Sequence, residues 1–142
     1  MSTSAVSKGA STSGADLPRI ALPVGDPAGI GPEIVLKTLT HEEVHALCRP
    51  IVIGDDAALA VHARAAGLNL VINSNSVRVE DAPAAAYCRV GLLPDGMPPL
   101  AQPTPEAGRA CVGYATAAMR SALRGDCDAV VAAPHTEAAV NA

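Results

Sequence analysis

Short apolar runs alternate with segments of helical periodicity along most of this chain. Nearly continuous apolar runs are typical of strands that are buried on both faces of a parallel sheet. We expect strands at 19–24, 50–54, 70–72 and 129–133, with weaker strand character at 77–79 and 86–90. We expect helices at 32–39, 40–47, 56–66 and 105–123. This alternation predicts an α/β fold, with a mainly parallel sheet flanked by helices.

Capping residues mark where these helices begin. Thr40, with Glu43 three residues later, forms a capping box for the second helix. Either Asp55 or Asp56 is expected to cap the third helix, and Thr104 the long fourth one. The segment 91–105, ahead of that helix, contains five prolines and is expected to be an extended loop.

The segment 20–33, IALPVGDPAGIGPE, carries the most specific signal in the chain. An apolar strand leads into a turn rich in glycine and proline, and a helix follows at once. Gly29 and Gly31 permit close backbone approach, and free amides at the helix start attract anions. Asp26 and Glu33 add two carboxylates. We expect this elbow to bind a small ligand, although it matches neither a P-loop nor the dinucleotide fingerprint.

A second candidate segment follows the predicted strand at 129–133. In open parallel sheets, ligands bind beyond the carboxyl ends of the strands, where His135 and Thr136 are expected to lie. The elbow follows another strand in the same way, so both loops are expected to line one cleft. The candidate residues of this substrate or cofactor cleft are Asp26, Gly29, Gly31, Glu33, His135 and Thr136.

The other histidines do not suggest a site. The run 41–45, HEEVH, matches the zinc pattern H-E-x-x-H, but its predicted helix is short and no third ligand follows nearby. We therefore expect a solvated helix there and assign no metal ligand. His62 has no obvious partner in its alanine-rich helix, and we expect it at the surface or its boundary.

Charge and composition exclude several classes of protein. The net charge is −4 without a Lys/Arg cluster, which argues against nucleic-acid binding. No apolar run approaches the roughly 20 residues that a membrane span needs. Residues 1–17 are rich in Ser, Thr, Ala and Gly and lack the apolar core of a secretory signal, so we expect a disordered leader and a cytoplasmic protein.

The predicted core is made of small side chains. The chain has no Phe or Trp and two Tyr, so its hydrophobic content of 49% is largely alanine. Small side chains bury little area, and we expect a weakly stabilised core. The four cysteines, Cys48, Cys88, Cys111 and Cys127, lack regular spacing and are expected to be reduced and mostly buried.

The elbow resembles a known family. Gly25 to Glu33 is similar to the opening motif of 4-hydroxythreonine-4-phosphate dehydrogenases, the PdxA family of vitamin B6 synthesis. It is also close to the opening of isopropylmalate and isocitrate dehydrogenases, which share that fold. A second stretch agrees with the middle of such enzymes, through Ala115–Met119, Gly125, Asp128–Val131 and Pro134. The resemblance covers 19–142, and it implies that 18–142 is the N-terminal part of an isocitrate/isopropylmalate dehydrogenase-like domain that is incomplete at its C-terminal end.

The resemblance implies an activity. Enzymes of this family oxidise a secondary alcohol beside a carboxylate-bearing carbon, with decarboxylation, using NAD (or NADP) and a divalent metal ion. The implied substrate is 4-hydroxythreonine-4-phosphate or a similar small molecule of pyridoxal phosphate biosynthesis. The metal ligands of the family are histidines of the later chain, and the site is shared across a homodimer. Metal and catalytic residues are therefore expected beyond Ala142.

One residue departs from the family pattern. Many 4-hydroxythreonine-4-phosphate dehydrogenases carry a lysine in the loop that matches 134–138, where this chain has Glu137. A carboxylate repels a phosphate dianion. Pro-His-x-Glu instead resembles the relatives that oxidise cis-dihydrodiol carboxylates in aromatic catabolism, which is the alternative function. A third possibility is a non-catalytic remnant or a small anion-binding module.

The first prediction concerns the chain by itself. Because the implied catalytic residues lie beyond Ala142, the purified 142-residue chain is expected to lack dehydrogenase activity. The measurement is the appearance of reduced NAD in the presence of each candidate alcohol. Any reproducible NAD reduction by the purified chain would overturn this expectation.

Overall fold

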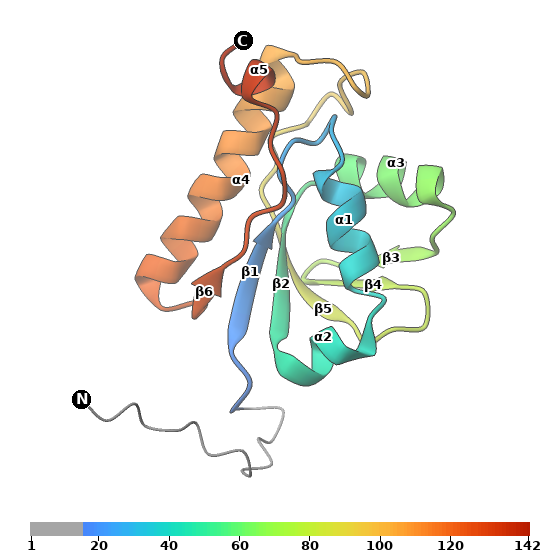
Figure 1. Ribbon diagram of the computed structural model, residues 1–142, viewed down its shortest axis with the longest axis vertical. Coiled ribbons are helices and arrows are strands. Elements are labelled where there is room, and N and C mark those ends of the chain that lie inside the picture. Colours follow the sequence, from blue (N-terminus) through green and yellow to red (C-terminus); the bar gives the residue numbers. More distant parts are fainter. Residues whose placement is uncertain (1–15) are drawn as a thin grey trace, which may run out of the picture.

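The computed structural model describes residues 16–142, which form one six-stranded sheet with helices packed around it (Figure 1). The strands are β1 (Arg19–Pro23), β2 (Arg49–Gly54), β3 (Leu70–Ile72), β4 (Ser76–Val79), β5 (Ala85–Arg89) and β6 (Ala129–Val130). The helices are α1 (Gly31–Thr38), α2 (Glu42–Leu47), α3 (Asp56–Ala66), α4 (Pro105–Arg124) and α5 (Glu137–Val140). The predicted α/β architecture is confirmed.

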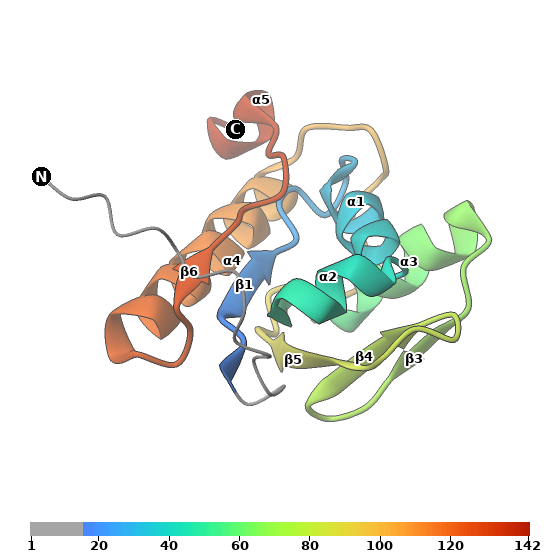
Figure 2. The same ribbon diagram turned by 60° about the horizontal axis from the view of Figure 1, so that its bottom comes forward.

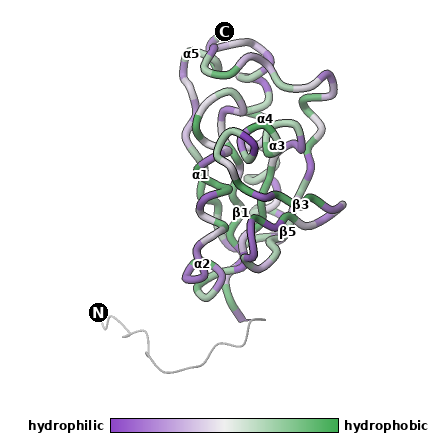
Figure 3. The backbone as a smooth tube through the Cα atoms, turned by 90° about the vertical axis from the view of Figure 1, so that its right-hand side faces the viewer, coloured by the Kyte–Doolittle hydropathy of each residue, from purple (hydrophilic) through white to green (hydrophobic). Residues whose placement is uncertain are grey.

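The sheet is mixed, with the strand order β3-β4-β5-β2-β1-β6. Strands β5, β2, β1 and β6 run parallel to one another, whereas the β3–β4 and β4–β5 pairs are antiparallel. A parallel crossover needs a dozen or more residues, and the short polar connection between β3 and β4 does not supply them. Hydrophilic colours mark the β3 margin of the sheet in Figure 3, in keeping with its exposed turns.

Helices cover both sides of the central strands. Figure 1 shows α4 on one side of β1 and β2, with α1, α2 and α3 on the other, and Figure 2 shows the same separation from another direction. Tyr114 of α4 is fully buried and supplies the largest side chain of the core. The same core also contains aliphatic side chains from the strands and from α1 and α3, among them Leu36, Ile53 and Leu59.

Most predicted boundaries of helices and strands lie close to the observed ones, and two predictions are wrong. Helix α4 begins as expected, because Thr104 Oγ1 accepts the N–H of Ala107 at 3.2 Å. The capping box is wrong: α2 starts at Glu42 after His41, and the Thr40 hydroxyl donates back to the Lys37 carbonyl at 2.7 Å. Strand β6 is shorter than predicted, although Val131 and Ala133 still donate to carbonyls of the β1 strand.

Asp55 does not act as the expected helix cap. It stands at the N-cap position of α3 without a capping hydrogen bond. Its buried carboxylate instead accepts the N–H groups of Gly91 and Leu92 and the hydroxyl of Tyr114, the last at 2.7 Å. One carboxylate thus ties the end of β2 to helix α4 and to the start of the proline-rich loop, and burial with this bond raises the pKa of Tyr114.

Asp56 makes a second connection between α3 and the sheet. Its carboxylate accepts the Tyr87 hydroxyl at 2.7 Å and both the Nε and one terminal nitrogen of Arg89 at 2.8 and 2.9 Å. The guanidinium also lies over the Tyr87 ring. The hydrogen bond from Arg89 lowers the pKa of the Asp56 carboxyl, so the pair stays ionised at neutral pH.

The cysteines are unpaired, and their burial is more varied than predicted. Cys111 and Cys127 are buried, Cys48 is half-buried and Cys88 is exposed on β5. Cys88 faces outward because alternate residues of β5 point to opposite faces, and its neighbour Tyr87 takes the inward position. Burial raises the pKa of the Cys111 thiol.

Within residues 16–142, no helix combines the length and apolar character that a membrane span requires.

The role of Asp55 can be tested by Asp55→Asn. The amide replaces one carboxylate oxygen with an NH₂ group, which faces backbone donors and cannot accept from them. At a buried site this lowers the free energy of unfolding by about 2 kcal/mol. Amide hydrogen exchange of Gly91 and Leu92 is expected to accelerate at least tenfold. Asp95→Asn is the matched control, because Asp95 is exposed in the same loop. Equal protection in the two variants would contradict the assignment.

Candidate functional site

The elbow at 24–30 joins β1 to α1 and lies beyond the carboxyl end of β1. The loop at 133–136 continues from β6, which runs parallel to β1 and pairs with it directly. Both loops therefore leave the sheet at the same edge, as Figure 1 shows. The N–H of Asp26 donates to the carbonyl of Pro134 at 3.2 Å, which joins the two loops.

Two glycines permit this contact. A Cβ on Gly25 would lie 2.2 Å from the carbonyl oxygen of Pro134, and Gly25 also has a positive φ of 75°. A Cβ on Gly31 would lie 2.2 Å from the carbonyl oxygen of Val24 and 3.0 Å from that of Pro134. Gly29 is less crowded, with its nearest contact at 3.3 Å. Gly25 and Gly31 are thus required for backbone to pack on backbone.

Asp26 holds the turn itself. Its side chain is buried, and Oδ1 accepts the N–H of Ala28 at 2.8 Å. Its carbonyl accepts the N–H of Gly29 at 3.0 Å. This is an Asx-type turn, in which the carboxylate replaces a backbone acceptor. The amides of Asp26, Ala28 and Gly29 therefore all have acceptors within the protein.

His62 is a structural anchor of the elbow, and the prediction of a surface or boundary position is wrong. The side chain is buried, and Nε2–H donates to the carbonyl of Pro27 at 2.7 Å. The acceptor is a backbone carbonyl 35 residues away, so nothing in the local pattern indicated it. The face of α3 that carries His62 packs toward α1 and the elbow.

Two further hydrogen bonds complete the clamp on the elbow. The N–H of Val24 donates to Ile53 of β2 at 3.0 Å, and the N–H of Ala101 donates to Ala28 at 2.8 Å. The elbow is thereby fixed by β2, by α3, by the proline-rich loop and by the 133–136 loop.

The remaining candidate residues are more exposed. Glu33 is on the outer side of α1 and forms an ion pair with Lys37 at 2.7 Å, and this hydrogen bond lowers the pKa of its carboxyl. Thr136 occupies the N-cap position of α5 without a side-chain capping bond. His135 is exposed beside it, and Glu137 is exposed as the first residue of α5.

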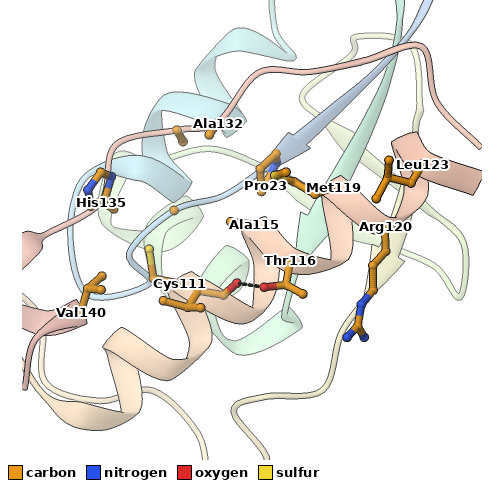
Figure 4. A pocket seen from close by; sticks show the side chains of 13 residues that line it. Pro23, Cys111, Ala115, Thr116, Met119, Arg120, Leu123, Ala132, His135 and Val140 are labelled. Carbon is orange, nitrogen blue, oxygen red and sulfur yellow. Dashed lines mark hydrogen bonds between the residues drawn. The ribbon is translucent and has the colours of Figure 1, made fainter.

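An apolar groove of about 440 Å³ flanks the two loops, between α4 and the segment that leads into α5 (Figure 4). Of the candidate residues, His135 lines it; the others do not. Figure 4 shows His135 and Val140 at one end and Leu123 with Arg120 at the other. Cys111 and Thr116 of α4 also line it, and no motif in the sequence marks either as a site residue.

The described residues contain no cluster of metal-ligating side chains. Within residues 16–142, no three His, Cys, Asp or Glu side chains lie together as a possible metal site. In the H-E-x-x-H run, His41 is exposed, and the His45 ring donates to the Leu39 carbonyl at 2.8 Å.

The elbow does not fit the diphosphate of a dinucleotide either. The space in front of Gly25 and Gly31, which would admit a phosphate, is filled by backbone carbonyls of the protein. Carbonyl oxygens repel an anion, and three of the nearby amides are already engaged. We therefore derive no catalytic step through a cofactor bound at this position.

Comparison with known proteins identifies the family. The family model described as "Pyridoxal phosphate biosynthetic protein PdxA" matches residues 46–142. The chain belongs to the PdxA family. The matched stretch begins after the elbow and includes the 133–136 loop and the long helix α4.

Curated relatives and solved structures agree with this membership. The chain is 37% identical over 124 residues to a 4-hydroxythreonine-4-phosphate dehydrogenase of Desulfosudis oleivorans, covering 82% of this chain and 35% of that protein. It is 35% identical over 134 residues to a D-threonate 4-phosphate dehydrogenase of Cupriavidus necator, covering 89% and 38%. The chain thus spans little more than a third of the length of these relatives.

Two crystal structures share the fold. A 4-hydroxythreonine-4-phosphate dehydrogenase from Burkholderia phymatum superposes with a TM-score of 0.73 at 34% identity, over 88% of this chain and 38% of that one. A terephthalate 1,2-cis-dihydrodiol dehydrogenase from Burkholderia xenovorans gives 0.66 at 34%, over 89% and 37%. The neighbours are dehydrogenases, and this chain has the fold of their matched part.

Gly31→Ala tests the contact between the two loops. The added Cβ would overlap the Val24 carbonyl, so the elbow must move away from Pro134. The N–H of Asp26, which donates to Pro134, is expected to lose at least tenfold of its hydrogen-exchange protection. Gly29→Ala is the matched control, because its Cβ meets only the Asp26 side chain at 3.3 Å. Similar exchange in both variants would refute the role of Gly31.

Proposed function

We propose that this chain forms the N-terminal part of an NAD- or NADP-dependent dehydrogenase that oxidises a secondary alcohol of a 4-phosphorylated four-carbon acid. The support is the pair of curated relatives, one named for 4-hydroxythreonine-4-phosphate and one for D-threonate 4-phosphate. Both names describe a four-carbon acid with a hydroxyl on C3 and a phosphate on C4. Family membership supports the reaction class, and the shared chemistry of the two names supports the substrate class.

The proposed reaction follows from the substrate. Oxidation of the C3 alcohol removes two electrons and two hydrogens and leaves a ketone two bonds from the carboxylate carbon. Such a 3-oxo acid loses carbon dioxide readily, because the electron pair released is delocalised onto the new carbonyl as an enolate. Pyridoxal phosphate biosynthesis is the proposed setting for the 4-hydroxythreonine-4-phosphate reaction.

We assign substrate contact to the 133–136 loop. His135 is exposed at the end of the groove, where its ring nitrogens are available to donate to an anionic oxygen. Thr136 has a hydroxyl that makes no capping bond and is available to a substrate hydroxyl. The observation that supports this assignment is the hydrogen bond from Asp26 to Pro134, because it fixes the loop against a rigid turn.

The elbow has a positioning role in this proposal. Asp26 and Gly31 hold the loop geometry, whereas Gly29 contacts the Asp26 side chain and Glu33 forms an ion pair with Lys37 outside the groove. We assign the divalent metal and the nicotinamide cofactor to the parts of the relatives that this chain does not span, together with the catalytic residues. We further propose a homodimer as the active form.

A second candidate is the oxidation of a cis-dihydrodiol carboxylate. Two observations favour it: the similarity to the terephthalate dihydrodiol dehydrogenase and the exposed carboxylate of Glu137 beside His135 and Thr136. A carboxylate at that place repels a phosphate dianion more strongly than it repels a carboxylate group, which carries one negative charge. The first candidate is preferred because the curated relatives named above act on 4-phosphates.

A chimeric enzyme can test the proposed function. Residues 16–142 would replace the aligned N-terminal segment of the Cupriavidus necator relative, and the full-length product would be assayed for NAD reduction. Oxidation of D-threonate 4-phosphate or 4-hydroxythreonine-4-phosphate is expected. Activity on a terephthalate cis-dihydrodiol without activity on either phosphate would favour the second candidate instead.

Glu137→Lys in the same chimera separates the two candidates further. Reversing one charge near a phosphate dianion is expected to lower the KM for the 4-phosphates about tenfold. The KM for a dihydrodiol carboxylate is expected to change less, because that substrate carries less charge per anionic group. Glu42→Lys, an equal charge reversal on α2, which lies at the opposite end of the molecule from α5 (Figure 1), is the control. Equal effects of the two variants would contradict the role of Glu137.

A further inference from the structure

Helix α4 exposes a row of large apolar side chains. Val112, Met119 and Leu123 are 48%, 60% and 85% exposed, and with Thr116 they follow the three- and four-residue spacing of one helical face. Val131 and Val140, at 58% and 40% exposure, continue this apolar surface from the β6–α5 segment. We refer to Val112, Met119, Leu123, Val131 and Val140 as the α4 face.

The α4 face is continuous, unlike the other exposed apolar residues. Elsewhere in 16–142 such residues occur singly or in pairs, for example Leu47 on α2, and Ile30 with Ile34 at the start of α1. Four of the five residues of the α4 face, all except Val131, line the groove together with Ala115 and Ala132. A contiguous exposed apolar patch of this kind marks an interaction surface, whereas scattered ones need no explanation.

The edge of the sheet is open on the same side. Strand β6 pairs with β1 alone among the described strands, so its other edge has no partner there. Figure 2 shows β6 and α4 together at one margin of the molecule. An open edge beside an apolar helix is a place where further secondary structure packs.

Charge adds a requirement for the partner. Arg109 and Arg124 on α4 are paired with Glu106 and Asp126. Arg120 lines the groove beside Met119 and Leu123, and it makes no ion pair within residues 16–142. A partner that covers the apolar row is therefore favoured if it places a carboxylate next to Arg120.

We propose that the α4 face is the docking surface for an amphipathic helix from the part of the PdxA fold that this chain does not span. Relatives with the same fold are more than twice as long, so most of their polypeptide must pack on or beside the part that is shared. The α4 face is the large apolar surface on the described residues that can receive it. The docking helix presents apolar residues at three- and four-residue spacing and an acidic residue opposite Arg120, irrespective of whether it belongs to the same polypeptide.

This proposal rests on family membership and not on the proposed substrate. Two other occupants are conceivable for an apolar groove: a second copy of this chain and a small apolar ligand. A second copy of the chain and a small ligand each predict an experimental result that differs from the one expected for a docking helix.

The test uses the full-length chimera described above, without substrate or cofactor. Leu123→Asp places a charge in the proposed interface and is expected to lower the melting temperature by about 5 °C or more. Leu47→Asp is the matched control, because Leu47 is 71% exposed on α2, away from the α4 face, and its melting temperature is expected to stay within about 1 °C. Arg120→Glu is expected to lower the melting temperature as well, by a smaller amount.

Several results would overturn the proposal. These are equal melting temperatures for Leu123→Asp and Leu47→Asp, or a chimera that fails to unfold cooperatively although the parent relative does. Sedimentation of the 142-residue chain gives the third: a dimer that Leu123→Asp abolishes means that a second copy covers the face. A groove that remains open to a small apolar dye in the folded chimera means that no helix covers it. An inactive chimera that keeps the Leu123 effect contradicts the proposed function and leaves this inference standing.

Discussion

The close approach of two stretches of backbone governs this structure. The elbow after β1 meets the carbonyl of Pro134 at a distance that only glycine permits at positions 25 and 31. The resulting hydrogen bond from Asp26 to Pro134 fixes the loop that carries His135 and Thr136. The segment after β6 is also held by the hydrogen bonds of Val131 and Ala133 to β1 and by the packing of α5 on α4. The candidate substrate loop thus owes its position to a contact that involves no functional side chain.

Buried polar groups contribute stability that large apolar side chains contribute in other protein cores. Asp55 and His62 are buried, and each satisfies backbone groups of a distant segment. A hydrogen bond to a carboxylate such as that of Asp55 contributes about 1.5–3 kcal/mol, comparable to burying one large apolar side chain. This offsets the small area that alanine buries, and no buried side-chain polar atom in 16–142 lacks a partner. The core of residues 16–142 thus combines small apolar side chains with buried polar side chains that are all hydrogen-bonded.

The sequence pattern predicted the strands and helices well, because apolar periodicity reflects burial directly. It also located the elbow and the family from the glycines and prolines at 25–33. It failed where the partner is remote: Asp55 bonds Tyr114 across 59 positions, and His62 bonds a carbonyl across 35. Local cap rules assigned Asp55 and Thr40 to helix starts. Tertiary contacts engage Asp55 instead, and the Thr40 hydroxyl donates to the Lys37 carbonyl three residues earlier. The sequence pattern also did not predict that the elbow glycines face protein backbone, because that depends on how the two loops lie in space.

The bond between His62 and Pro27 has a consequence for which side chain position 62 accepts. A carbonyl oxygen can only accept, so the ring nitrogen that faces it carries a hydrogen. A residue of similar size without a donor at this point would remove the hydrogen bond to the Pro27 carbonyl. The choice of residue in the middle of α3 is therefore constrained by the backbone of a turn 35 positions away.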